Sequence, residues 1–282
     1  QRRVIDRPSQ GVEVVSCVLC GSNEHVPAIV SKNWDSQDQA DVWFQVVRCQ
    51  GCGLHFENPR PDAEYLQSFY PPQYYAYLNV EPKSSSGWQE FSEAIGWWTK
   101  CGVRQAFCGY PAGWVKRWML RLVLWPLWVR MRLLGKDIKV MPYRGRGRLL
   151  ELGCGTGASL NYQRRYGFDV TGVEPSAAAV HVARTRYTLH VVEGTLEVAR
   201  FPDRSFDVIF MSHVFEHLPN PVTTLQEMHR VLDVGGLIVL KIPNIASASA
   251  RRFGPYWLGL DVPRHLYHFS PETMTRLLEG HG

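Results

Sequence analysis

From residue 148 onward, short apolar runs alternate with longer segments of helical character. The predicted strands cover residues 148–153, 169–174, 190–194, 206–211 and 236–242, and the predicted helices cover residues 158–166, 176–187 and 225–232. Strands that alternate with helices at this pitch predict an α/β fold, in which helices cover both faces of a parallel sheet.

A glycine-rich turn, Gly153-Cys154-Gly155-Thr156-Gly157, joins the first predicted strand to the first predicted helix. Glycines let a ligand approach the backbone closely, here at the amino end of a helix. Glu174 ends the next predicted strand, where an acid can accept hydrogen bonds from both hydroxyls of a ribose. The pattern therefore predicts a nucleotide-type ligand at the carboxyl ends of the strands.

The details of the turn favour a particular kind of nucleotide. In the dinucleotide fingerprint the third glycine lies five positions after the first, whereas Gly157 lies four after Gly153. Glu151 precedes the turn, and a carboxylate there repels a pyrophosphate but suits a cationic aminoacyl-sulfonium group.

Five stretches of the chain resemble class I S-adenosylmethionine-dependent methyltransferases. They are Leu150–Gly157, Gly172–Ser176, Pro202–Asp207, His217–Pro221 and Leu232–Gly236. The resemblance implies a Rossmann-like methyltransferase sheet with S-adenosylmethionine as methyl donor. It also implies two further strands after the last helix, beyond the end of this sequence.

The resemblance implies a role for each matching position of the cofactor site. Glu151 would meet the amino group of the methionine portion, and Glu174 would hold the ribose diol. Thr195 and Leu196 would border the adenine, although members of the class usually carry an acid where Thr195 stands. The complete set expected at the cofactor is Glu151, Gly153, Cys154, Gly155, Gly157, Glu174, Pro175, Thr195, Leu196, Met211 and Ser212.

Four of the seven cysteines form two C-x2-C-G pairs, Cys17 with Cys20 and Cys49 with Cys52. Two thiolates three positions apart can bind one metal ion from a tight turn, and the following glycine permits the positive φ that turns amides toward sulfur. Together the pairs predict a closed, structural Zn²⁺ site in a zinc-ribbon-like module, with a strand-like run at residues 42–47 before the second pair. Cys101, Cys108 and Cys154 are interpreted as ordinary thiols.

The cysteine pairs also extend the resemblance. Followed by Asn58-Pro-Arg-Pro61, and combined with the tail at residues 263–270, they are similar to a bacterial subset of the class that carries an N-terminal zinc-binding region. Members of that subset are associated with methylation of sugars, polysaccharides and secondary metabolites.

Methyl transfer from a sulfonium is an in-line displacement, so the protein must align the acceptor and remove its proton where needed. Histidine suits that task because it titrates near neutrality. The first candidate bases are His213, Glu216 and His217 after the fourth strand, and the second group is Arg264, His265 and His268 in the late loop at residues 263–270. In the alternative interpretation, Glu216 and His217 only brace their loop, and residues 263–270 form a turn before a last helix that Ser270 caps.

Residues 94–148 contain twelve Lys/Arg and one acid, a net charge of +11, whereas the whole chain carries +5. The same segment holds six of the ten tryptophans, namely Trp97, Trp98, Trp114, Trp118, Trp125 and Trp128. Three interpretations stay open: a helical lid over the active-site mouth, peripheral membrane contact through residues 114–134, and nucleic-acid binding.

These patterns divide the chain into a zinc-ribbon-like module at 1–60, an aromatic linker with the basic Trp-rich segment at 61–145, and a methyltransferase domain at 146–282. We expect methyl transfer to a small-molecule, sugar or glycan/lipid-linked acceptor; the alternative is an RNA methyltransferase that binds RNA through the zinc module and the basic segment. The sequence shows no secretory signal, so we expect reduced thiols and a cytoplasmic protein, with the inner face of the membrane as the surface available to residues 114–134.

Overall fold

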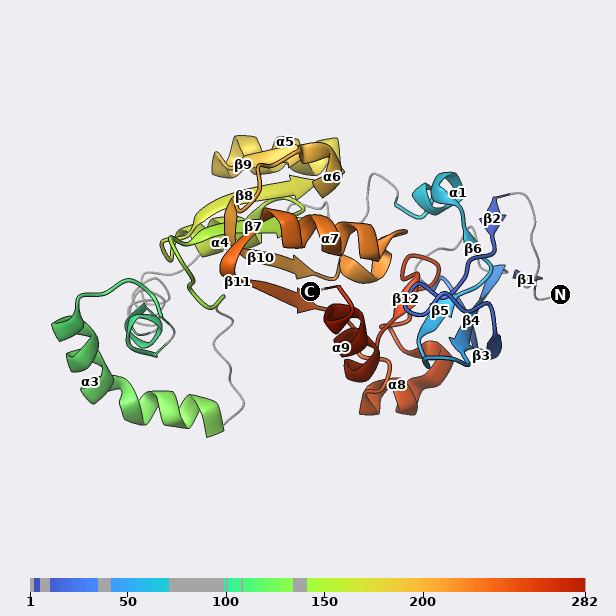
Figure 1. The fold of residues 1–282 in the computed structure, drawn as a ribbon, viewed down its shortest axis with the longest axis horizontal. Helices are drawn as coiled ribbons and strands as arrows, with labels where there is room; N and C mark the ends of the chain where they lie inside the picture. Colours follow the sequence, from blue (N-terminus) through green and yellow to red (C-terminus); the bar gives the residue numbers. More distant parts are fainter. Residues whose placement is uncertain are drawn as a thin grey trace, which may run out of the picture. The chain divides into compact units, whose positions relative to one another are not determined.

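A computed structural model describes residues 3–5, 11–34, 42–70, 99, 101–107, 109–133 and 141–281 (Figure 1). The chain divides into two compact units. Unit 1 comprises residues 1–75, 211–229 and 240–282, and unit 2 comprises residues 76–210 and 230–239. The units therefore do not follow the three successive segments expected from the sequence, because the C-terminal part of the chain folds with the cysteine module.

Unit 2 is built on a five-stranded sheet with the order β11-β10-β7-β8-β9. Its strands are β7 (Arg148–Leu152), β8 (Asp169–Glu174), β9 (His190–Glu193), β10 (Phe206–Ser212) and β11 (Leu232–Lys241). β7 pairs in parallel with β8, and β8 pairs in parallel with β9. The expected α/β sheet is confirmed, with the first strand at its centre.

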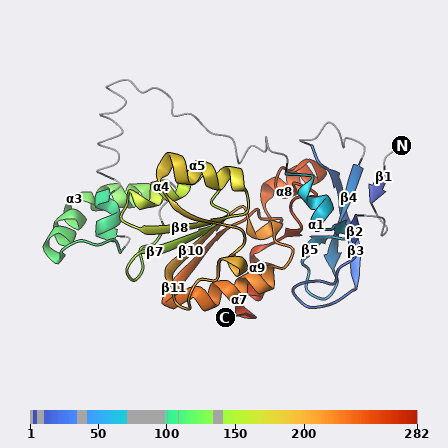
Figure 2. The same ribbon diagram turned by 90° about the horizontal axis from the view of Figure 1, so that it is seen from above.

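Unit 2 has helices before the sheet and between its strands. They are α3 (Trp114–Leu133), α4 (Ala158–Arg164), α5 (Ala177–Tyr187) and α6 (Leu196–Ala199), and residues 101–107 are also helical. Figure 2 shows α4 and α5 side by side on one face of the sheet. Their buried residues join those of the strands in one core, which includes Leu149, Leu160, Val180, Val191 and Val208.

An ion pair fixes the amino ends of the central strands. The Asp207 carboxylate on β10 accepts hydrogen bonds from the backbone amides of Arg146 and Arg148 at 3.0 and 2.9 Å. The Arg148 guanidinium also donates to Asp207 at 2.9 Å and to Asp233 at 2.6 Å. Burial alone would raise the pKa of Asp207, but these hydrogen bonds hold it below its ordinary value.

Unit 1 contains a second, mostly antiparallel sheet around the cysteine module. It has the order β1-β4-β5-β12, and β3 pairs with the other side of β4. Its strands are β1 (Arg3–Ile5), β3 (His25–Lys32), β4 (Val42–Cys49), β5 (His55–Glu57) and β12 (Tyr267–His268), and β2 (Val12–Glu13) pairs with β6 (Arg60–Pro61) beside it. The strand expected before the second cysteine pair is confirmed as β4.

Short helices complete unit 1. They are α1 (Ala63–Gln67), the 3₁₀ helix η2 (Phe215–His217), α8 (Ala248–Phe253), the 3₁₀ helix η3 (Gly254–Tyr256) and α9 (Pro271–Glu279), while α7 (Pro221–Val231) begins in unit 1. The core of the unit joins Phe44 and Val46 of β4 to Phe69, Leu260 and Val262.

Two backbone hydrogen bonds bring three distant parts of the sequence together in unit 1. The Glu57 amide donates to the Leu266 carbonyl at 2.9 Å, and the Leu266 amide donates to the Glu216 carbonyl at 2.9 Å. The strand after the second cysteine pair, the late loop and the segment after β10 are therefore neighbours.

The structure differs from the predicted elements at two places. β11 begins at Leu232 rather than at residue 236, because Gly235, which has a positive φ of 74°, interrupts the apolar run that marked the strand. Tyr267 and His268 form β12, which the sequence did not indicate, whereas the expected cap is confirmed: the Ser270 side chain accepts from the Thr273 amide at the start of α9. Trp97, Trp98, Cys108 and residue 134 lie outside the described residues.

We predict that Gly172→Ala destabilises the protein by about 1–3 kcal/mol, because the added methyl group would lie 2.6 Å from both Cys154 Sγ and Leu160 Cδ1. Thermal unfolding followed by circular dichroism measures the effect. Gly113→Ala is the matched control, since a Cβ at Gly113 meets nothing within 4 Å. Equal melting temperatures for the two variants would contradict the packing described here.

Candidate functional site

The glycine turn after β7 has a backbone that other residues rarely adopt. Gly153, Gly155 and Gly157 have φ angles of 65°, 53° and 80°. At Gly157 an added Cβ would also lie 2.6 Å from Leu189 Cδ1 and 2.9 Å from Ala183 Cβ. The turn therefore passes close to α5 and exposes main chain at the carboxyl end of β7, as a bound nucleoside requires.

Glu174 lies at the end of the neighbouring strand and faces this turn. Its carboxylate accepts hydrogen bonds from the Gly155 amide at 2.8 Å and from the Ser176 amide at 3.0 Å. Burial raises the pKa of Glu174, and these two hydrogen bonds lower it. A carboxylate held by two amides is placed to accept hydrogen bonds from the two hydroxyls of a ribose.

Glu151 supplies a second buried carboxyl group on β7. It is 4% exposed, and its Oε2 atom has no hydrogen-bond partner among the described residues. Burial raises the pKa of Glu151 to about 8, although a hydrogen bond with Ser159 lowers it. An incoming ammonium group would satisfy the orphaned oxygen and favour its ionised form, so the position fits the amino group of S-adenosylmethionine.

The other residues expected at the cofactor lie at the carboxyl ends of the strands or in the segments that follow those strands. Cys154 is buried against Gly172, Pro175 is exposed after β8, Thr195 precedes α6, and Leu196 is buried as its first residue. Met211 and Ser212 end β10, at the point where the chain passes into unit 1. The glycine turn, Glu151 and Glu174 together fit a cationic nucleoside.

The four cysteines of the two pairs converge in unit 1. Their sulfur atoms lie within 4.8 Å of one another, with Cys17 and Cys52 at 3.5 Å and Cys20 and Cys49 at 3.5 Å. Sulfurs around a tetrahedral zinc ion are separated by about 3.8 Å, given Zn–S bonds of about 2.3 Å. The donor set and its spacing therefore fit zinc.

The two cysteine turns repeat the same backbone hydrogen bonds. The amides of Gly21 and Gly53, both at positive φ, donate to the carbonyls of Cys17 and Cys49 at 2.7 and 3.0 Å. The amides of those two cysteines in turn donate to Ser22 and Leu54, at 2.9 Å each. The glycine after each pair is thus required by the turn, as the spacing predicted.

Elsewhere in unit 1, three of the predicted catalytic residues approach one another. Donor atoms of Glu216, His217 and His265 lie within 4.8 Å of one another, and the His217 and His265 rings meet edge to face at 4.5 Å. Such a carboxylate and two imidazoles can relay a proton, and their spacing also suits a divalent metal ion.

Backbone carbonyls set the tautomer of both imidazoles. The Nδ1 atom of His217 lies 2.9 Å from the Arg264 carbonyl, and Nδ1 of His265 lies 3.0 Å from the Gly259 carbonyl. Because a carbonyl only accepts, these contacts favour a proton on each Nδ1 and a lone pair on each Nε2. In this arrangement the Tyr70 hydroxyl, 2.8 Å from His217 Nδ1, accepts from the same N–H group. Burial lowers the pKa of both histidines, so both rings are neutral at physiological pH.

Glu216 is the buried acid of the group. It is 1% exposed, and neither carboxylate oxygen accepts a hydrogen bond from the described residues. Its Oε1 lies 3.4 Å from His213 Nδ1 and 3.8 Å from His265 Nε2. Burial, together with the charge of Asp261, raises the pKa of Glu216 to about 7.

The remaining predicted bases lie at the margin of this group. His213 is largely exposed and has a positive φ of 55°, a conformation that its amide stabilises by donating to Lys241 at 2.8 Å. His268 is buried on β12, with its ring centre 6.5 Å from that of His265.

Sequence reasoning missed two neighbours of the group. The Tyr70 hydroxyl lies 2.8 Å from His217 Nδ1, and Asp261 Oδ2 lies 3.6 Å from His265 Nε2. The aromatic run after the cysteine module was visible in the sequence, but nothing in it distinguished Tyr70 from its neighbours.

The described part of the basic Trp-rich segment, residues 101–107 and 109–133, packs at a different place from the lid that one interpretation predicted. Arg104 packs 3.3 Å above the ring of Tyr166, which follows α4, and Tyr110 packs on Phe168, which precedes β8. These contacts lie at the amino end of β8, opposite the end that carries Glu174. The described part of the segment therefore covers the edge of unit 2 away from the glycine turn.

Comparisons with known proteins agree with the class that the sheet order and the glycine turn define, the class I S-adenosylmethionine-dependent methyltransferases. A family described as a methyltransferase domain matches residues 128–282, more than half of the chain. The chain belongs to this methyltransferase domain family.

Several curated relatives are methyltransferases that act on different acceptors. A malonyl-[acyl-carrier protein] O-methyltransferase from Serratia marcescens is 32% identical over 130 residues, which cover 46% of this chain and 50% of the relative. A ubiquinone biosynthesis O-methyltransferase from Alkalilimnicola ehrlichii is 31% identical over 107 residues, covering 34% and 42%. The chain thus spans about half the length of the curated relatives it matches.

Among solved structures, an S-adenosylmethionine-dependent methyltransferase from Thermotoga maritima aligns with a TM-score of 0.43 and 25% identity, covering 58% of this chain and 80% of that one. Within the described residues, no helix combines the length and the apolar composition needed to cross a bilayer.

We predict that Glu174→Gln weakens S-adenosylmethionine binding by about 10- to 100-fold, because a hydrogen bond to a charged group contributes about 1.5–3 kcal/mol. Isothermal titration calorimetry measures the dissociation constant. Asp169→Asn is the matched control, since Asp169 is an exposed acid at the opposite end of the same strand. Unchanged affinity in Glu174→Gln would show that this carboxylate does not hold the ribose.

Proposed function

We propose that the protein transfers a methyl group from S-adenosylmethionine to a hydroxyl oxygen of a small-molecule, sugar or glycan/lipid-linked acceptor. The observation that carries the proposal is the buried Glu216–His217–His265 group, in which a neutral imidazole with a free Nε2 lies beside an unsatisfied carboxylate. A hydroxyl acceptor must lose its proton during methylation, and this group is suited to take it.

The donor supplies an activated methyl group on a sulfonium, so the chain's own residues have two tasks. The glycine turn, Glu151 and Glu174 would hold the methionine and ribose portions. His217 would accept the acceptor's proton at Nε2, and Glu216 would stabilise the resulting imidazolium by its negative charge.

Two of the relatives support an oxygen acceptor, since their names describe a malonyl-[acyl-carrier protein] O-methyltransferase and a ubiquinone biosynthesis O-methyltransferase. The four-cysteine site adds a second element to the proposal. We infer that it holds a structural Zn²⁺ that stabilises the module, because four protein sulfurs leave no open coordination position.

We predict that His217→Ala lowers methyl transfer by about 10²- to 10⁴-fold and leaves S-adenosylmethionine affinity unchanged. The assay uses radiolabelled S-adenosylmethionine and bacterial extract separated into lipid, glycan, small-molecule, RNA and protein fractions. His229→Ala is the control, since His229 is an exposed histidine on α7.

The rate of methyl transfer should rise from pH 6 to pH 8 as Glu216, with its pKa of about 7, becomes ionised, and Glu216→Gln should abolish this rise.

Two results of that assay would contradict the proposal. Label confined to RNA would instead support an RNA methyltransferase that binds its substrate through the basic segment. Full activity of His217→Ala on a hydroxyl acceptor would exclude this histidine as the base.

We predict that the purified protein contains about one zinc ion per chain and that Cys49→Ser loses it. The melting temperature should fall by more than about 5 °C, because metal binding stabilises a module with a small core. Elemental analysis and calorimetry measure the two effects. Cys101→Ser, a cysteine of unit 2, should retain both the metal and the melting temperature, and a metal-free wild type with the same stability would refute the site.

A further inference from the structure

One face of α3 is packed against helical residues 101–107 of unit 2. At Gly102 an added Cβ would lie 2.7 Å from Leu124 Cδ1, and the rings of Phe107 and Trp128 stack at 4.9 Å with planes 16° apart. Arg121 donates to the Ala106 carbonyl at 2.8 Å, which ties the helix to the same neighbour. The orientation of α3 is therefore fixed by helical residues 101–107.

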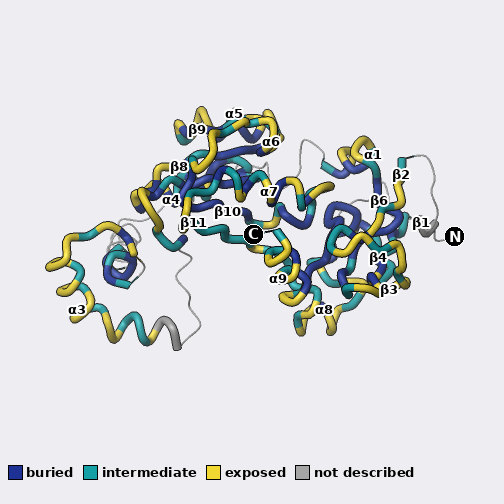
Figure 3. Tube along the Cα trace, in the orientation of Figure 1, coloured by how far each residue is buried: buried dark blue, intermediate teal, exposed yellow. Residues whose placement is uncertain are grey.

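The opposite face of α3 is apolar and exposed. Trp114, Trp118, Leu122 and Trp125 follow one another at spacings of four, four and three residues and are 84%, 62%, 59% and 57% exposed. Val115, Met119 and Val123 lie beside this row and are also exposed, so that seven of the fifteen exposed large hydrophobic residues in the described part of the chain belong to this one helix. Figure 3 shows the described part of α3 coloured mostly as exposed or intermediate. Scattered apolar residues are normal on a surface, but a continuous face of this kind marks a binding surface.

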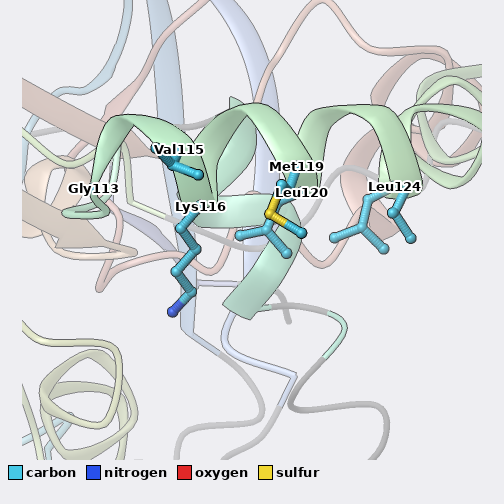
Figure 4. Close-up of a pocket in the computed structure, with 7 residues that line it drawn as sticks. Gly113, Val115, Lys116, Met119, Leu120 and Leu124 are labelled. Carbon is cyan, nitrogen blue, oxygen red and sulfur yellow. The ribbon is translucent and has the colours of Figure 1, made fainter.

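The charged residues of α3 are all of one sign. Residues 109–133 contain five basic residues and no acid, namely Lys116, Arg117, Arg121, Arg130 and Arg132. In Figure 4, Lys116, Met119, Leu120 and Leu124 project from the same side of the helix, where they line a hollow of about 560 Å³. Apolar and cationic side chains are thus interleaved along α3.

We propose that α3 is an interfacial anchor that lies on the surface of an anionic lipid bilayer. The tryptophan and leucine face would enter the boundary between headgroups and acyl chains, while the exposed Lys116 and Arg130 would meet anionic headgroups. Tryptophan favours this depth because its ring is apolar and its N–H is polar.

The same observations disfavour other occupants. A second copy of this helix would bring two basic surfaces together without any acid on α3 to compensate them. RNA would pair with the basic residues but would leave the apolar face exposed to water. The proposal does not depend on the proposed acceptor or base, because it concerns the edge of unit 2 away from Glu174.

The test is co-sedimentation of the whole chain with vesicles of phosphatidylcholine alone or with about 30% phosphatidylglycerol. We predict binding to the anionic vesicles, which the double variant Trp118→Ser/Leu122→Ser weakens at least tenfold, because each buried apolar side chain contributes about 1.5–3 kcal/mol. Binding should also weaken in 1 M salt, which shortens the Debye length to about 3 Å.

Leu258→Ser is the matched control, since Leu258 is 86% exposed but lies on unit 1, and it should bind vesicles like the wild type. S-adenosylmethionine affinity should be the same in all variants, which separates loss of lipid binding from loss of folding. Three results would overturn the proposal. They are wild-type protein that stays in the supernatant, vesicle binding by the double variant equal to that of the wild type, and a wild-type dimer that the double substitution dissociates.

Discussion

The close approach of the glycine turn to α5 is the constraint on which the cofactor site depends. Gly157 sits against Ala183 and Leu189 with no room for a side chain, and this contact fixes the path of the chain between β7 and α4. The path turns the Gly155 amide toward Glu174, so the backbone itself places the carboxylate. With Glu151 buried nearby on β7, the turn is bordered by acids, which suits a cationic nucleoside and opposes a pyrophosphate.

Unit 1 gives the cysteine module a role beyond its own stability. The second cysteine turn ends β4, and β5, which follows it, pairs with β12 and bonds through Glu57 to Leu266. The Leu266 amide donates in turn to the Glu216 carbonyl, so hydrogen bonds connect β5 to the two segments that carry His217 and His265. A zinc ion bound by the four cysteines would stabilise the Glu216–His217–His265 group indirectly, because it would fix the start of β5, on which β12 and the preceding residues pack.

Local patterns predicted much of this architecture. Apolar runs predicted the strands of the sheet. The positions of the glycines predicted both the turn at Gly153–Gly157 and the two cysteine turns. Both kinds of feature depend on residues that are neighbours in the sequence. The pairing of β12 with β5 joins residues more than 200 positions apart, and no local pattern encodes such a contact. For the same reason, His217 and His265 were predicted as separate candidate bases. No local pattern indicated that Tyr70 lies beside His217 or that Asp261 lies beside His265. Charge and tryptophan content likewise describe a surface without saying which end of the sheet it covers, so the position of residues 101–107 and 109–133 could not be predicted from them.

The basic Trp-rich segment and the glycine turn lie at opposite ends of the strands of unit 2, and each end has its own physical requirements. The glycine turn requires exposed main chain and buried acids at the carboxyl ends of the strands, whereas α3 presents apolar side chains and cations beside the amino ends. If α3 covered the cofactor, its arginines would lie near Glu151 and Glu174 and would compete with a cationic ligand for those carboxylates. Placing the basic helix at the far edge removes that competition. There α3 packs on Phe107 of helical residues 101–107, which Arg104 joins to Tyr166, and it is free to meet an anionic surface without altering the donor site.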